Sequence, residues 1–289
     1  MALVFEHVSY TYAPLTRHQI KEGQKPLWAL DDISFEIEDG EFLAIAGHTG
    51  SGKSTLVLHL NGVINPTRGK VLWNGQDLSD KKIANQARGD IGIVFQYPEH
   101  QLFAATVYED VAFGPRNLGL SAEEVEQRVK EGLELVELDY DTFKDRSPFE
   151  LSGGQQRRVA FAGVLAMRPT TLVLDEPVAG LDPASRNDFL DLIDKLHAHG
   201  ITLVMVSHNM NDIARLADRM IVLDHGEIAL SGTPEEVFAH PTKLREIGLG
   251  VPHAQRMANE LRELGIPLED DLYSPELLAD RLATLLRSE

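Results

Sequence analysis

Hydrophobic and polar residues alternate in two segments near the start of the chain, residues 3–10 and 33–38. Because successive side chains of a strand point to opposite faces, this period of two predicts two β-strands. The segment between them, from about residue 14 to residue 26, is mostly polar and has a proline at each end. It is typical of a long hairpin loop. We therefore expect the chain to begin with an antiparallel pair of strands.

A different pattern begins at Phe42, where the continuous apolar run FLAIA leads into a glycine-rich turn and then a helical pattern from Lys53. Later apolar runs each precede or follow a helical pattern, at residues 91–95, 171–174, 202–206 and 220–223. Strands that are apolar on both faces and alternate with helices are typical of a parallel sheet covered by helices. The pattern predicts an α/β fold with a mostly parallel central sheet.

Residues 98–167 contain no convincing strand pattern. Ser121 and Glu124 have the spacing of a capping box, which predicts a helix from this point to about Val136. We interpret residues 98–167 as an inserted helical subdomain.

The chain after Gly232 has a different character. Thr233 and Pro234 have the pattern of a helix cap followed by a first-turn proline. The remaining residues are charged, helical in pattern and repeatedly interrupted by proline. The predicted organisation is one domain at residues 1–232 and a small C-terminal helical appendage at residues 233–289.

Composition narrows the function classes. The 289 residues are 43% hydrophobic, which is enough for a sizeable core, and they include no cysteine, which excludes disulfides and thiol catalysis. A formal net charge of -18 disfavours nucleic acid as the main partner. No apolar stretch approaches the roughly 18 to 20 residues of a membrane-spanning helix, and the first residues lack the pattern of a secretory signal. We expect a cytoplasmic protein that does not itself cross a membrane.

The turn after the Phe42 run matches the phosphate-binding pattern G-x-x-x-x-G-K-[ST]. Its residues are Gly47, His48, Thr49, Gly50, Ser51, Gly52, Lys53 and Ser54, with Thr55 next in the helix. Glycines let backbone N–H groups turn toward phosphates, Lys53 adds a point charge, and the Ser54 hydroxyl can coordinate Mg²⁺. A chance match in a chain of this length is on the order of one in a hundred. The alternative, a turn that only caps a helix, is disfavoured by the flanking strand and helix.

The strand predicted at residues 171–174 ends in two carboxylates, Asp175 and Glu176. Neighbouring side chains at a strand end point in different directions and can take different roles. Asp175 would hold Mg²⁺, directly or through water, while Glu176 would act as general base toward the attacking water. Alone, the pair could be an ordinary acidic strand end, but together with the phosphate loop it indicates nucleotide hydrolysis.

The segment Leu151 to Gln155, with the sequence LSGGQ, is the most discriminating motif and resembles the signature of ABC ATPases. The resemblance implies that Ser152, Gly153, Gly154 and Gln155 contact the γ-phosphate bound to the opposite subunit. It also implies the fold of an ABC nucleotide-binding domain, with a RecA-like parallel sheet core, an N-terminal antiparallel β subdomain and an inserted helical subdomain. ATP and Mg²⁺ are the implied ligands.

Other positions extend this resemblance. Gln96 matches the glutamine that senses Mg²⁺ and the attacking water, His208 matches the switch histidine that holds the γ-phosphate, and Asp182 matches the loop aspartate that faces the other subunit. Tyr12 matches the aromatic residue that stacks on adenine, although Tyr10 competes for this role. We favour Tyr12 because Tyr10 falls within the strand alternation and can simply pack in the core.

The resemblance narrows further to energy-coupling factor (ECF) transporters, specifically the second of their two ATPase types. It rests on the runs YPEHQLF after Gln96, TVYEDVAFGPRNLG, and PFELSGGQQRRVAFAGVLAMRP, together with the long loop in the N-terminal hairpin. Val178 and Gln156 depart mildly from the usual motifs, at positions that are not catalytic in the family. The resemblance implies a peripheral protein on the cytoplasmic face of the cell membrane, which energises uptake of a vitamin or transition-metal ion. The implied complex has two ATPases, a transmembrane coupling subunit and a membrane-embedded substrate-capture subunit.

In this family the segment after the glutamine lines a groove that receives coupling helices of the membrane subunit. Pro98, Gln101, Leu102 and Phe103 match that segment. Leu102 and Phe103 could equally form a small core contact of the helical subdomain.

Two other function classes compete with an importer ATPase. ABC ATPases that act on DNA or ribosomes typically need coiled-coil insertions, tandem domains or basic surfaces, and none is visible in the sequence. A small-molecule phosphotransferase would have no use for the signature or for His208. The sequence leaves the transported substrate open, as well as the choice between a homodimer and the favoured heterodimer.

Overall fold

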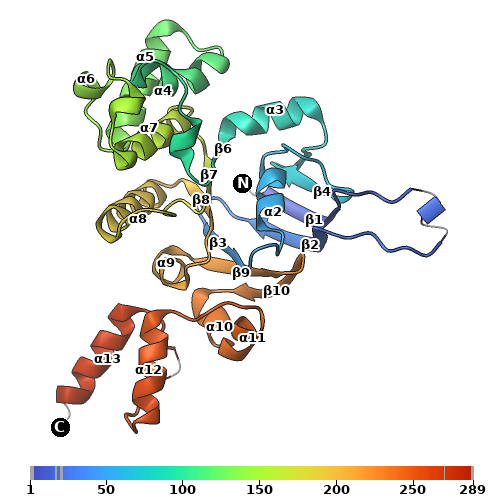
Figure 1. Cartoon of the computed structure of the whole chain (residues 1–289), viewed down its shortest axis with the longest axis vertical. Helices are drawn as coiled ribbons and strands as arrows, with labels where there is room; N and C mark the ends of the chain where they lie inside the picture. The colour runs from blue at the N-terminus through green and yellow to red at the C-terminus, as the bar shows by residue number, and fades with distance from the viewer. Residues whose placement is uncertain (1–2, 17, 20–21, 270, 288–289) are drawn as a thin grey trace.

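The computed structural model describes residues 3–16, 18–19, 22–269 and 271–287 (Figure 1). The predicted antiparallel start is confirmed: β1 (Leu3–Tyr10) pairs with β2 (Leu30–Ile37). The sheet continues through β4 (Arg68–Trp73) and β5 (Gln76–Asp77), in the order β2-β1-β4-β5. The sequence pattern did not predict β4 and β5.

The central sheet has the order β10-β9-β3-β8-β7-β6. Its strands are β3 (Phe42–Gly47), β6 (Ile91–Val94), β7 (Thr171–Asp175), β8 (Thr202–Val206), β9 (Arg219–Asp224) and β10 (Glu227–Gly232). All pairings are parallel except that of β9 with β10. The carboxyl ends of β3, β6, β7 and β8 therefore meet at one edge of the sheet, where ligands of open α/β sheets bind.

Alternate residues of the central strands enter different cores. Leu43 and Ile45 of β3 pack with the antiparallel sheet and with α2 (Lys53–Leu60) and α3 (Lys81–Asp90). Phe42, Ala44 and Ala46 face the opposite core, which includes α8 (Pro183–Ala198) and α9 (Met210–Leu216). Burial of both faces accounts for the continuous apolar run in the sequence.

Residues 98–167 form helices joined by loops, with no strand, and this segment projects from the sheet (Figure 1). It comprises η1 (Pro98–Gln101), α4 (Val107–Asn117), α5 (Ala122–Leu135), α6 (Tyr140–Phe143), η2 (Pro148–Glu150) and α7 (Gly153–Leu165). The capping box at the start of α5 is confirmed, since Ser121 and Glu124 satisfy each other's backbone N–H groups.

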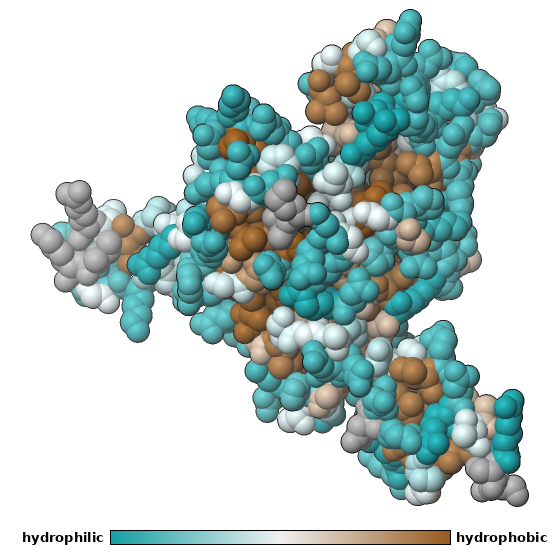
Figure 2. Space-filling view, turned by 180° about the vertical axis from the view of Figure 1, so that it is seen from behind, coloured by the Kyte–Doolittle hydropathy of each residue, from teal (hydrophilic) through white to brown (hydrophobic). Residues whose placement is uncertain are grey.

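The last helices are α10 (Pro234–Phe238), α11 (Pro241–Glu246), α12 (His253–Glu263) and α13 (Pro275–Arg287). Phe238 and Leu244 are buried in the main core, whereas α12 and α13 form a small separate core. These two helices lie at one end of the molecule and expose apolar residues there (Figures 1 and 2). By their packing, α10 and α11 therefore belong to the main body, although both follow the predicted division at residue 233. Among the described residues, none of the helices is both long and apolar enough to cross a bilayer.

Candidate nucleotide-binding site

The loop between β3 and α2 requires glycine at two positions. A Cβ atom on Gly47 would lie 2.4 Å from the Ser51 hydroxyl oxygen and 2.5 Å from the carbonyl oxygen of Leu223. A Cβ on Gly52 would lie 2.6 Å from the Ala29 carbonyl oxygen, and the φ angle of Gly52, 109°, is one that other residues avoid. The loop is therefore packed tightly against β9 and against the chain entering β2.

Lys53 places its positive charge over this loop. Its Nζ donates hydrogen bonds to the carbonyl oxygens of Gly47, at 2.7 Å, and His48, at 2.8 Å. Burial lowers the pKa of the Lys53 ammonium, while the nearby carboxylates of Glu176 and Asp175 act to raise it. A cation and an array of turned backbone amides in one loop are suited to an anionic phosphate chain.

A cavity of about 550 Å³ opens beside the loop, and most of the residues predicted to bind ATP line it. Its lining residues are Tyr12, Ala29, Thr49, Gly50, Gly52, Lys53, Ser54, Thr55, Gln96, Asp175, Glu176 and His208. Gly47, His48 and Ser51 belong to the same loop but do not line the cavity. Gln96, Asp175 and His208 come from the carboxyl ends of β6, β7 and β8, so the sheet topology brings them together.

The two carboxylates after β7 both line this cavity. Glu176 has a φ of 51°, which ends the alternation of the strand and accounts for two consecutive side chains facing one pocket rather than diverging. Burial raises the pKa of Asp175, and the neighbouring Glu176 carboxylate adds to this effect against the charge of Lys53. Such crowding of like charges favours a bound cation.

Glu176 also has a defined partner. Its Oε1 accepts a hydrogen bond from the backbone N–H of His208 at 3.1 Å and lies 2.7 Å from the His208 Nδ1. Both contacts involve Oε1, which leaves Oε2 to accept a proton. The histidine ring itself is largely exposed.

Of the two tyrosines considered for adenine stacking, only Tyr12 lines the cavity. Its hydroxyl lies 3.2 Å from that of Thr55, and its ring is mostly exposed. Tyr10 packs edge-on against Tyr12 and against His59, beside the core of the antiparallel sheet. The exposed ring is the one free to stack on a base.

The signature segment lies apart from the nucleotide cavity. Ser152 and Gln155 form a capping box that begins α7, and together with Gly154 they line a different cavity of about 200 Å³. Asp182 lies nearby as the N-cap of α8, where it accepts hydrogen bonds from the backbone of Ala184 and Ser185. A single chain thus keeps the signature separate from its own phosphate loop.

Arg157, in α7, forms a set of hydrogen bonds near the nucleotide cavity that the sequence did not predict. Its Nε and Nη2 donate to both carboxylate oxygens of Glu99, at 3.0 and 2.7 Å, and its Nη1 donates to the carbonyl oxygens of Pro177 and Ala179. Arg157 therefore links the helix after the signature to η1 and to the loop that follows Glu176.

This order of motifs is matched in known proteins. The sequence model of the family described as ABC transporter matches residues 30–179. The energy-coupling factor transporter ATP-binding protein EcfA2 of Clostridium perfringens is 47% identical over 290 residues, covering 100% of this chain and 99% of that protein. The chain belongs to the ABC transporter family. Within it, the chain is an ATP-binding subunit of the energy-coupling factor type.

Solved structures agree with the fold. The protein cbiO1 from Clostridium perfringens, part of the ABC transporter complex cbiONQ, has a TM-score of 0.73 and 35% identity, covering 90% of this chain and 98% of that one. An ATP-binding cassette solved as a dimer, in a post-hydrolysis state with ADP and phosphate, has a TM-score of 0.68 and 32% identity. It covers 81% of this chain and 99% of its own. The ABC nucleotide-binding fold predicted from the motifs is confirmed.

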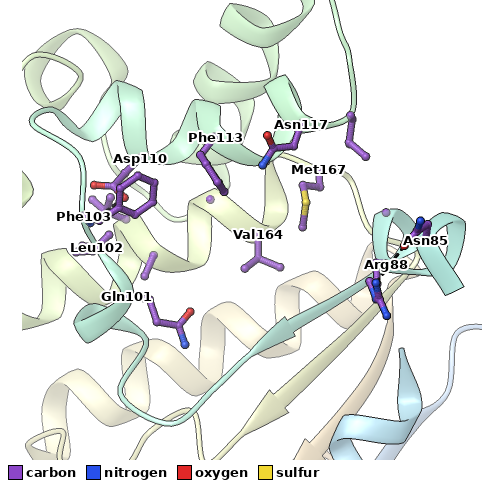
Figure 3. Close-up of a pocket in the computed structure, with 16 residues that line it drawn as sticks. Asn85, Arg88, Gln101, Leu102, Phe103, Asp110, Phe113, Asn117, Val164 and Met167 are labelled. Carbon is purple, nitrogen blue, oxygen red and sulfur yellow. Dashed lines mark hydrogen bonds between the residues drawn. The ribbon is translucent and has the colours of Figure 1, made fainter. Parts of the chain in front are cut away.

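A groove of about 390 Å³ separates the helical subdomain of this ABC ATPase from α3 (Figure 3). Of the predicted lining residues, Gln101, Leu102 and Phe103 line it, with Phe103 edge-on to Phe113 at 5.1 Å. Pro98 does not: it is buried at the start of η1, where its fixed φ suits the first helical position. Figure 2 shows apolar residues in the hollow beside the helical subdomain.

The segment with Phe103 is held in place from α4. The Asp110 carboxylate accepts hydrogen bonds from the backbone N–H groups of Phe103, at 3.2 Å, and Ala104, at 3.0 Å. Burial raises the pKa of Asp110, although these two hydrogen bonds oppose the shift. Phe103 is 61% exposed, so its ring faces the groove surface and not a core.

Proposed function

We propose that this subunit binds ATP in the cavity beside the phosphate loop and hydrolyses it with Glu176 as general base. The observation that carries the proposal is the position of the Glu176 carboxylate in that cavity, oriented through Oε1 by His208. Its Oε2 would take the proton of the attacking water. Lys53 and the amides of the loop would hold the β- and γ-phosphates, and Tyr12 would stack on adenine.

The residues of the cavity also fit Mg²⁺. Ser54, Gln96 and Asp175 offer a hydroxyl, an amide and a carboxylate oxygen, the hard donors that this ion prefers. Bound Mg²⁺ would neutralise charge on the β- and γ-phosphates. The raised pKa of Asp175 supports this assignment, because a carboxylate destabilised by burial and by Glu176 gains most from a nearby cation.

We infer that the signature acts in trans. Ser152 and Gly154 line a cavity that shares no lining residue with the nucleotide cavity, and they lie at the N-terminus of α7, where backbone N–H groups favour anions. A second ATPase subunit would bring its nucleotide to this surface, with Asp182 at the contact, so that ATP binding closes the dimer. We favour a heterodimer with a related subunit in the working transporter.

The partner in the membrane would dock in the groove beside Phe103. The groove is lined by apolar residues of α4 and α7, and an exposed aromatic pair in such a groove is a typical anchor for a partner's helix. The subunit would then lie on the cytoplasmic face of the cell membrane, in a complex with a transmembrane coupling subunit and a membrane-embedded capture subunit. The cargo would be a vitamin or a transition-metal ion.

The proteins that co-purify with the tagged chain from detergent-solubilised membranes test this proposal. We expect a second ATP-binding subunit and two kinds of multi-spanning membrane protein, in a complex that hydrolyses ATP. Recovery of the chain without membrane proteins, or with ribosomes or DNA, would contradict the transport function.

A further inference from the structure

A group of side chains that could ligate a metal lies beside the phosphate loop, outside the nucleotide cavity. It consists of His48, Asp224 at the end of β9, and His225 in the turn before β10. The nitrogen and oxygen atoms that these residues offer all lie within 4.8 Å of one another. The His48 Nε2 is 3.0 Å and the His225 Nε2 is 3.7 Å from the Asp224 Oδ1. None of these residues lines the nucleotide cavity.

The hydrogen bonds of His48 define which nitrogen is free to act as a ligand. Its Nδ1 lies 2.8 Å from the carbonyl oxygen of Thr49, which can only accept, so Nδ1 carries the proton. In the neutral ring, Nε2 then presents a lone pair to a carboxylate oxygen 3.0 Å away. Two facing lone pairs repel, and a cation coordinated by both atoms would relieve this repulsion. A backbone carbonyl that fixes the other ring nitrogen is also the usual support of a metal-bound histidine.

We propose that His48, Asp224 and His225 bind a divalent transition-metal ion such as Zn²⁺. Ligand bonds of about 2.1 Å in a tetrahedral site put ligand atoms about 3.4 Å apart, and the two separations at Asp224 Oδ1, 3.0 and 3.7 Å, lie on either side of this value. The His225 ring is 84% exposed and can turn to complete the site. Two imidazoles and one carboxylate favour Zn²⁺, Ni²⁺ or Co²⁺ over the Mg²⁺ that accompanies ATP.

The ion would tie the turn between β9 and β10 to the phosphate loop. The two segments already touch, because the N–H of Gly226 donates to the carbonyl oxygen of Ser51 at 3.0 Å. The Lys53 ammonium also donates a hydrogen bond to the carbonyl oxygen of His48. The proposed metal ligand His48 is therefore hydrogen-bonded to the lysine that would hold the phosphates. The site is thus positioned to make the phosphate loop responsive to a transition metal.

Titration of the tag-free, metal-stripped full chain with Co²⁺ and Zn²⁺ tests the proposal, with Mg²⁺ in excess and no nucleotide. We expect one saturable site per chain, with the visible absorption of tetrahedral Co²⁺ and its displacement by Zn²⁺. Asp224→Asn and His225→Asn should each weaken binding at least tenfold, since even loss of a supporting group costs about 10- to 100-fold. Asparagine tolerates the left-handed φ of His225, 46°.

His7→Asn is the matched control. His7 also has a left-handed φ, 51°, and its Nδ1 lies 2.7 Å from a carboxylate, that of Asp32, but it is not in the three-ligand cluster. Metal affinity should be unchanged in this variant. Absence of a saturable site in the wild-type chain would overturn the proposal and leave His48 and Asp224 as an ion pair only. Equal affinity in wild type, Asp224→Asn and His225→Asn would overturn it as well.

Discussion

Replacing Arg157 by methionine tests whether one buried guanidinium couples α7 to η1 and to the loop that follows Glu176. The side chain is 3% exposed, and its main partner, Glu99, is 16% exposed. The change would keep the volume and apolar stem of the side chain but remove four hydrogen bonds. It would leave the Glu99 carboxylate without its cation, and the carbonyls of Pro177 and Ala179 without this donor.

The expected cost follows from this burial. Removing one partner of a buried, hydrogen-bonded ion pair costs about 3–5 kcal/mol, because the remaining charge stays desolvated. Glu99→Gln also leaves a buried charge, that of Arg157, but it should cost less because the amide oxygen and the carbonyls of Pro177 and Ala179 still accept hydrogen bonds from the guanidinium. The interaction energy between the two positions should be about 1.5–3 kcal/mol, in the range of hydrogen bonds to charged groups.

A double-mutant cycle in chemical denaturation measures this interaction energy, using Arg157→Met, Glu99→Gln and the double variant of the purified chain. Burial acts to raise the pKa of Glu99, but the hydrogen bonds and positive charge of Arg157, together with a backbone hydrogen bond and the nearby His100, hold the pKa below its ordinary value. The stabilisation is therefore present above the ordinary carboxylate range and lost as pH falls through the lowered pKa. The interaction energy should shrink in acid.

Additive effects, within about 0.5 kcal/mol, would refute the reasoning, because independent sites add within that margin. A pH-independent interaction energy would refute the assignment to the ion pair. In the reconstituted transporter, Arg157→Met should reduce uptake more than ATP binding, since the lost contacts join α7 to η1 and to the loop after Glu176 and do not involve the phosphate loop.

Three further changes test separate parts of the account. Ser152→Arg should abolish most ATPase activity of the assembled dimer but leave the ATP affinity of the monomer within about twofold, and collapse of that affinity would show that Ser152 serves its own pocket. Phe103→Asp should remove apolar contact worth about 1.5–3 kcal/mol with the membrane subunit and block its capture in pull-downs, without lowering the melting temperature. The control is Phe149→Asp, because the Phe149 ring is 62% exposed but lies outside the groove, so this variant should still be captured. A lower melting temperature of the Phe103→Asp monomer would instead indicate that Phe103 packs in a core. Asp175→Asn should abolish Mg²⁺-dependent hydrolysis yet raise the melting temperature of the nucleotide-free chain, by about 2–4 °C for each kcal/mol gained. The reason is that a carboxylate with a raised pKa destabilises the fold once pH exceeds that pKa. An unchanged or lower melting temperature would contradict the assigned burial of Asp175.

Local patterns in the sequence predicted the elements that depend on local physics. The strand at residues 3–10, the strand at residues 202–206 and the capping box of α5 all occur as predicted. Their signals are alternation, burial on both faces and a fixed three-residue spacing. β4, which lies between β1 and β5, escaped prediction because its first half, residues 68–70, is exposed and contains Arg, Gly and Lys in place of apolar residues, and β5 is only two residues long.

Contacts between distant segments were harder to predict. Arg157 follows the signature on a polar stretch that reads as a solvated helix surface, and its partner Glu99 lies 58 residues earlier. Only the fold brings them together. The metal-ligating group has the same origin: His48 looks like a variable position of the phosphate loop until the parallel pairing of β3 with β9 brings Asp224 beside it. Pro98 shows the opposite error, since a residue adjacent to groove residues in sequence is buried by the turn that it begins.

The rate of Mg-ATP hydrolysis by the Glu176→Gln variant tests the central claim most directly. Glutamine keeps the shape of the side chain and can still accept the hydrogen bond from the His208 backbone, but it cannot accept a proton from water. We predict that the purified chain loses hydrolysis by roughly two to four orders of magnitude. It should keep its ATP affinity and accumulate as a closed, ATP-bound dimer. Hydrolysis near the wild-type rate in this variant would contradict the assignment of Glu176 as general base and the function built on it.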